Sequence, residues 1–136
     1  MANFVYGKAK QGILNGQFNF SLDTFKIAFV KNTYTPSQSV HEFLSDIGAS
    51  NISYTSPIIE NITNTLGIID ADDLNFSLPA NTAFNSIVFY KLGANDSSSR
   101  LLFYIDTSEG IPFPGSSEVV TLIFNWSNTV NKILAI

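Results

Sequence analysis

The stretch Asp23–Ile47, DTFKIAFVKNTYTPSQSVHEFLSDI, contains the clearest strand, break and helix start in the chain. Its first part, Thr24–Lys31, is rich in Phe, Ile and Val and predicts a buried β-strand. Pro36 disfavours helical angles at the residue before it, so this strand cannot run directly into a helix. A capping-box pattern that begins at Ser39 then predicts a short helix over Val40–Ile47. The stretch therefore predicts one central strand followed by one short helix.

Upstream of this stretch, residues Asn3–Asn15 predict an N-terminal helix. Asn3 can cap it, apolar residues recur at four-residue spacing from Val5, and Gly16 is placed to end it. The alternation of apolar and polar residues over Phe18–Leu22 predicts a short strand or an extended lead-in to the central strand.

Downstream, the pattern is β throughout. Turn-rich residues over Gly93–Ser99 predict a hairpin loop, and the proline- and glycine-rich segment Glu109–Gly115 predicts a second loop. Short strands without long helices predict a mainly β fold: a single antiparallel, β-sandwich-like domain over residues 1–136, with an N-terminal helix and one short internal helix. The predicted strands cover residues 51–55, 58–63, 66–71, 74–78, 84–92, 100–106, 118–126 and 130–136.

Composition narrows the class of protein. A chain of 136 residues suits one domain, and 45% apolar residues with twelve Phe and five Tyr provide ample surface to bury. Only 13% of residues are charged, and the scattered bases of a chain with net charge −4 argue against direct nucleic-acid binding. The chain has no cysteine for a disulfide and no apolar run long enough to cross a membrane. Without a signal-peptide pattern, we expect synthesis in the cytoplasm of the host cell.

Motifs for catalysis or a cofactor are weak, so the sequence predicts neither. A Ser-His-Asp triad would require His41, the single histidine, as its base, and its place beside a predicted helix cap argues against that role. His41-Glu42 begins like the zinc motif HExxH, but the second histidine is missing.

An acidic cluster, Asp70, Asp72 and Asp73, is the one candidate metal site. Strand alternation would place Asp70 and Asp72 on the same face, where two carboxylates could bind calcium. We favour a solvated strand end or turn. The cluster and the single Trp126 are the only support for an alternative function as a calcium- or carbohydrate-binding module.

Several short motifs follow one another along most of the chain: Leu14-Asn15-Gly16, Asp23–Val30, Tyr34–Asp46, Asp70–Phe76, Tyr90-Lys91 and Tyr104-Ile105-Asp106. These motifs and their order resemble small virion structural proteins of tailed bacteriophages. The segment Ile52–Thr65 departs from that pattern, because it lacks the glycine-rich stretch expected there.

The resemblance implies a virion component without enzymatic activity. Among virion roles we favour a capsid auxiliary protein, which decorates or cements the head shell by added protein–protein contacts. The implied partners are the major capsid protein or other virion proteins, with a homo-oligomer as a further option, and neither nucleic acid nor membrane. A ring-forming tail or head–tail adaptor is the alternative. We expect partner contacts at the N-terminal helix and the two loops, at Lys8, Lys10, Asn95, Asp96, Ile111 and Phe113.

Overall fold

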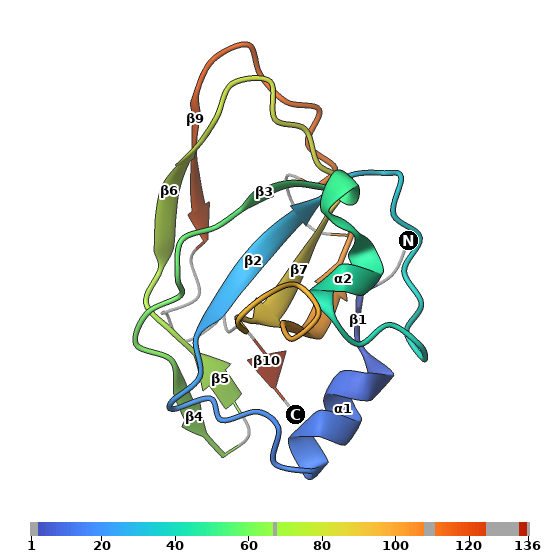
Figure 1. Ribbon diagram of the computed structural model, residues 1–136. Helices are drawn as coiled ribbons and strands as arrows, with labels where there is room; N and C mark the ends of the chain where they lie inside the picture. Colours follow the sequence, from blue (N-terminus) through green and yellow to red (C-terminus); the bar gives the residue numbers. More distant parts are fainter. Residues whose placement is uncertain (1–2, 67, 108–110, 125–133, 136) are drawn as a thin grey trace.

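The computed structural model describes residues 3–66, 68–107, 111–124 and 134–135 (Figure 1). It confirms the predicted class: a mainly β fold whose sheets are antiparallel, with the short helices α1 (Gly7–Leu14) and α2 (Leu44–Ile47). No helix in these ranges is long and apolar enough to cross a membrane. The strands are β1 (Asn3–Val5), β2 (Phe25–Val30), β3 (Ile52–Thr55), β4 (Thr63–Thr65), β5 (Ile68–Asp70), β6 (Leu74–Leu78), β7 (Ser86–Lys91), β8 (Arg100–Ile105), β9 (Val120–Phe124) and β10 (Leu134–Ala135).

A five-stranded sheet with the order β1-β8-β7-β2-β3 forms the centre of the molecule. The predicted central strand is β2, which pairs with β7 over its whole length, from Phe25 opposite Lys91 to Val30 opposite Ser86. β7 and β8 form the predicted hairpin. Two smaller sheets, β10-β5-β4 and β6-β9, complete the fold.

One face of the central sheet is covered by aromatic packing. Phe25, Ile27 and Phe29 of β2 are all buried and alternate with residues of the other face. The ring of Phe29 lies 5.7 Å from that of Phe76 in β6 and 4.8 Å from that of Phe84. The β6–β9 ribbon therefore packs on this face (Figure 1).

The ribbon connects to the sheet through an arch, which we define as residues 79–84 and 113–119. Asn81 N–H donates to the Ser116 carbonyl (2.6 Å), and Phe84 and Phe113 exchange two backbone hydrogen bonds of 3.0 and 2.8 Å. These bonds continue the pairing of the ribbon through the arch, which passes over the upper end of the sheet in Figure 1.

The other face of the sheet is covered by residues 31–47, including α2 (Figure 1). Tyr34 is buried here beside Tyr6, and its ring lies 6.3 Å from that of Tyr104. Leu44 and Ile47 of α2 are also buried, and Leu44 N–H donates to the Ser99 carbonyl at 2.8 Å.

The prediction of one helix over Asn3–Asn15 is wrong at its start. Residues Asn3–Val5 instead form β1, which pairs with the end of β8, and the helix begins at Gly7. Phe4 stacks on Tyr104, with ring centroids 5.1 Å apart, which explains why this segment prefers the sheet edge. Asn3 does not cap a helix, since its side-chain amide donates to the Thr107 carbonyl at 2.9 Å.

Three further boundaries differ from the predictions. The internal helix is α2, four residues long, and the carboxylate of Asp46 rather than Ser39 accepts backbone N–H groups at its start, from Glu42 and Phe43. Residues 18–22, predicted as a short strand or an extended lead-in, contain no strand, and residues 20–22 form a turn. The strand predicted over 58–63 is reduced to an isolated bridge at Ile59, and Thr63 instead begins β4. Parts of the last two predicted strands, with Trp126, lie outside the described residues.

Candidate functional site

The predicted contact residues lie in three separate parts of the molecule. Lys8, which is partly buried, and Lys10, which is exposed, belong to α1 at the lower end of Figure 1. Ile111 and Phe113 are partly buried at the base of the arch, where the ring of Phe113 lies 5.4 Å from that of Phe84. The structure does not bring these pairs together into one site.

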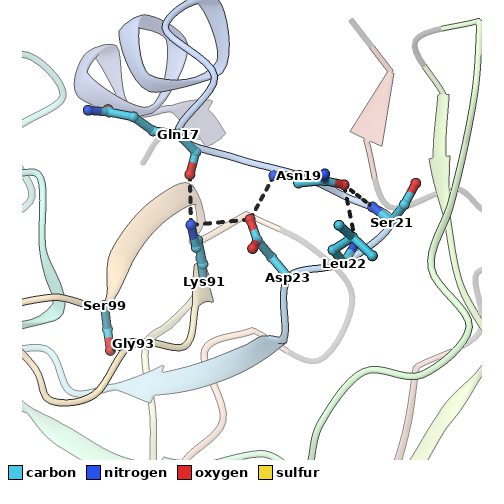
Figure 2. Close-up of polar contacts among 8 residues, drawn as sticks. All are labelled: Gln17, Asn19, Ser21, Leu22, Asp23, Lys91, Gly93 and Ser99. Carbon is cyan, nitrogen blue, oxygen red and sulfur yellow. Dashed lines mark hydrogen bonds and ion pairs between the residues drawn. The ribbon is translucent and has the colours of Figure 1, made fainter.

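The loop with Asn95 and Asp96 is held by its own hydrogen bonds and by α2. Asn95 Oδ1 accepts hydrogen bonds from the Ser97 and Ser98 hydroxyls. Gly93 N–H donates to Ser99 Oγ at 3.0 Å, across the neck of the loop (Figure 2). Asn95 thus shapes the loop, whereas the side chain of Asp96 is exposed.

The acidic cluster does not form the shared strand face that its spacing predicts. β5 ends at Asp70, whose Oδ1 accepts the Ala71 N–H at 2.9 Å. Asp72 lies in the following loop and accepts a hydrogen bond from the side-chain amide of Asn61. Within the described part of the chain, no three acidic or histidine side chains are grouped as metal ligands.

His41 ends a chain of hydrogen bonds that begins at the buried Tyr6 and becomes partly exposed at His41. Its Nδ1 lies 3.2 Å from the donating Ser37 N–H and 2.7 Å from the Tyr34 hydroxyl, which is in turn 3.0 Å from the Tyr6 hydroxyl. A backbone N–H can only donate, so Nδ1 carries no proton, Tyr34 donates to it, and Tyr6 donates to Tyr34. Burial raises the pKa of Tyr34 to about 12, although its hydrogen bond with Tyr6 lowers it. This arrangement anchors residues 34–41 over the sheet.

Asn19 organises a turn between α1 and β2, shown in Figure 2. Its Oδ1 accepts the N–H groups of Ser21 (3.0 Å) and Leu22 (3.2 Å). This side-chain pattern mimics a backbone turn and closes the chain locally. It leaves the Leu22 side chain 82% exposed.

An ion pair fastens the same turn to the central sheet. Asp23 Oδ2 accepts the Asn19 N–H at 2.6 Å and lies 3.2 Å from Lys91 Nζ (Figure 2). Lys91 Nζ also donates to the Gln17 carbonyl at 2.8 Å. Leu22 is therefore exposed on a turn held at both ends.

Two other leucines are equally exposed near this turn. Leu14 at the end of α1 is 87% exposed, and Leu66 between β4 and β5 is 96% exposed. Between these elements lies a hollow of about 310 Å³, lined by residues of α1, the turn, β4 and β5. We call Leu14, Leu22 and Leu66 with this hollow the lower apolar end. Its lining includes the apolar residues Ile13, Phe18, Phe20 and Ile69.

A larger cleft of about 830 Å³ lies beneath the arch. One wall is formed where β2 ends and β3 begins, at Lys31, Asn32, Ile52 and Ser53, and the other by residues 81–85 and 112–114. A smaller hollow of about 200 Å³ shares Lys31, Asn32, Asn85 and Pro112 with the cleft and extends to Tyr104 and Asp106. We call the two together the strand-end groove.

No family model, curated protein or solved structure matches the chain. The candidate surfaces must therefore be assessed from their geometry alone. The described residues present the lower apolar end, the strand-end groove and a further hollow of about 380 Å³ beside the Gly93–Ser99 loop, whose lining includes Asn95 and Asp96.

The sequence singled out Phe113, which lines the groove, as a contact residue, but it did not single out Lys31, Asn32 or the three leucines. Leu22 carried a weak signal, because an Asn-Phe-Ser-Leu sequence before an aspartate suits a side-chain-closed turn. The groove had no such signal, because its walls come from four distant segments.

Proposed function

We propose that the chain is an auxiliary structural protein of a tailed-phage particle that decorates or cements the head shell. It would act by protein–protein contact alone. The resemblance of its ordered motifs to virion structural proteins supplies the phage context, and the lower apolar end supplies the surface.

The observation that carries this proposal is the exposure of three leucines: Leu14 at the end of α1, Leu22 in the Asn19 turn and Leu66 between β4 and β5. Burial of one leucine side chain contributes about 1.5–3 kcal/mol, so leaving three of them in water forgoes a large stabilisation. Apolar patches of this kind on a small protein mark interaction surfaces. Because the turn beside Leu22 is held by Asn19 and Asp23, docking there requires little additional ordering.

Several residues of the shared motifs contact one another within the fold, so their role is to hold the structure together rather than to carry out chemistry. Asp23 of the first strand motif pairs with Lys91 of the Tyr-Lys motif. Tyr34 packs against Tyr104 of the Tyr-Ile-Asp motif. The resemblance therefore concerns residues that connect distant parts of the sheet and its covers.

A cement protein stabilises the shell through selective binding. If it binds only the mature lattice, each occupied site stabilises the intact shell relative to the ruptured one. This stabilisation grows with the concentration of free protein. A standard interface of about 1,200–2,000 Å² is expected for stable attachment.

The first test is the number of copies per purified virion, measured by quantitative mass spectrometry against the major capsid protein. Hundreds of copies are expected for a shell protein, since only the icosahedral shell offers that many equivalent positions. About a dozen copies would instead support the tail or head–tail adaptor. Absence from the virion would overturn both structural roles.

A second test uses matched surface variants. Leu22→Ser should reduce incorporation into particles while changing the free energy of unfolding by less than about 0.5 kcal/mol. Val119→Ser is the control, because Val119 is 64% exposed in the arch, which lies at the upper end of Figure 1, away from the lower apolar end. Equal incorporation of the two variants would exclude this end as the attachment surface. Deleting the N-terminus is unsuitable, since β1 and the fully buried Tyr6 belong to the core.

A further inference from the structure

We propose that the strand-end groove binds an extended peptide segment that carries an acidic side chain. This inference goes beyond attachment at the lower apolar end and does not depend on the chain belonging to a phage particle. It rests on the shape, the hydrogen-bonding groups and the charge of the groove.

The groove runs across the ends of four neighbouring strands. Its lining includes residues where β3 begins, β2 ends, β7 begins and β8 ends, and these strands are adjacent in the sheet. Three strand spacings amount to about 15 Å, which is the length of about five extended residues. A narrow path of this length suits an extended chain better than a compact ligand.

Three asparagines offer hydrogen-bonding groups along this path. The side-chain amides of Asn32, Asn81 and Asn85 are exposed and make no hydrogen bond to other described residues. An amide side chain presents both a donor and an acceptor, the same pair that a peptide backbone requires. The groove therefore complements main-chain groups.

Apolar contacts are available between the amides. Ile52 and Phe113 are partly buried and face the cleft together with Pro112 and Pro114. These four residues could accommodate one apolar side chain of the bound segment. A sugar would more often stack on an exposed Trp or Tyr ring, and the aromatic residues of the cleft are Phe84 and Phe113.

The charge of the cleft selects an acidic segment. Lys31 is its single charged residue, and it is exposed. Lys31 Nζ donates one hydrogen bond, to the Ser50 carbonyl at 3.1 Å, so an ammonium group with three donors can also bind a carboxylate. Asp106 lies in the smaller hollow, where its carboxylate accepts hydrogen bonds from the hydroxyls of Tyr104 and Thr107. The acidic side chain is therefore expected near Lys31.

The test is a titration of the full ¹⁵N-labelled chain with the peptide acetyl-Thr-Val-Asp-Val-Thr-amide, followed by NMR. Shifts are expected at the backbone amides of Asn32, Ser53 and Asn85, with half-saturation at about 1 mM, which corresponds to weak binding. The same peptide with Lys in place of Asp should bind more weakly. Absence of shifts at about 5 mM, equal binding of both peptides, or shifts only outside the groove would overturn the proposal.

Variants of Lys31 separate charge recognition from unspecific contact. Lys31→Gln should weaken binding of the Asp peptide about two- to fivefold, the contribution of an exposed ion pair, and Lys31→Arg should retain it. Neither variant should shift the melting temperature, because Lys31 lies at the surface. Maltopentaose is the competing probe: if it shifts the groove amides and the peptide does not, the ligand class is carbohydrate and the peptide proposal is wrong.

Discussion

The two faces of the five-stranded sheet are covered in different ways. On the ribbon face, Phe29 packs against Phe76 and Phe84, ring against ring. On the opposite face, the cover is anchored by hydrogen bonds from Tyr6 through Tyr34 to His41. The first cover is continuous with strand pairing, whereas the second is an irregular segment with one short helix.

The difference follows from where the backbone hydrogen bonds go. Strands β6 and β9 pair with each other, so the side chains that they bury need not provide polar partners. The irregular cover has backbone N–H groups without a strand partner, such as that of Ser37. Side chains must accept the hydrogen bonds that these groups donate. An irregular cover therefore needs buried polar residues, and a ribbon does not.

The largest effect is expected on the ribbon face. Phe29→Ala removes a fully buried ring and should reduce the free energy of unfolding by about 3–5 kcal/mol, measured by urea denaturation. Phe20→Ala is the matched control: Phe20 is only partly buried and stacks on Phe25, at the other end of β2 from Phe29, so its loss should cost clearly less. A larger loss for Phe20→Ala would contradict the role of Phe29 as the centre of this face.

On the other face, Tyr34→Phe should reduce stability by about 1–3 kcal/mol, because it leaves His41 Nδ1 and the buried Tyr6 hydroxyl without their shared partner. Adding Tyr6→Phe should cost less than the sum of the single changes, since both act on one network. Tyr54→Phe serves as the control, as its hydroxyl makes no hydrogen bond within the described part of the chain. Additive losses would show that the hydroxyls act independently.

Alkaline pH gives the Tyr34 variant a second readout. The pKa of Tyr34 is raised by burial from 10.0 to about 12, so its neutral form is favoured in the folded protein. The stabilisation that this provides is complete below pH 10 and is lost as the pH rises from about 10 through 12. Wild type should therefore lose more stability over this range than Tyr34→Phe. Parallel pH profiles would contradict the prediction.

A smaller effect is expected from the ion pair that ties the Asn19 turn to the ribbon face. Asp23→Asn and Lys91→Met, alone and together, should reveal a coupling energy of about 0.5–1 kcal/mol, because both side chains are partly exposed. High salt should weaken this coupling. A coupling of zero would mean that the turn is held by Asn19 and backbone contacts alone.

An effect of similar size is expected at the start of α2. Asp46→Ala removes the acceptor for two backbone N–H groups and should cost about 0.5–1 kcal/mol at pH 7. Burial raises the pKa of Asp46, but the N–H groups of Phe43 and Glu42, with His41, leave it below the usual 3.8. A lowered pKa stabilises the fold above about pH 4, so the difference from wild type should shrink as the pH falls below 3.8. A constant difference would exclude Asp46 as the charged cap.

Local patterns predicted the regular strands well. The alternation Leu74, Phe76, Leu78 corresponds to β6 over the same residues, and the apolar run before the Gly93–Ser99 loop corresponds to β7 of the observed hairpin. Within such segments, each residue's burial depends on its neighbours at period two, which the sequence displays directly. The candidate surfaces had no equivalent local signal.

The sequence by itself determined the mainly β class, the central strand β2 and the β7–β8 hairpin, because periodicity and turn residues act over a few positions. Only the tertiary structure decided that Asn3–Val5 is a strand, since its pairing partner is the distant end of β8. The same holds for the strand-end groove and the lower apolar end. Both surfaces are assembled from segments far apart in the chain, and their proximity depends on strand order, which short-range patterns do not encode.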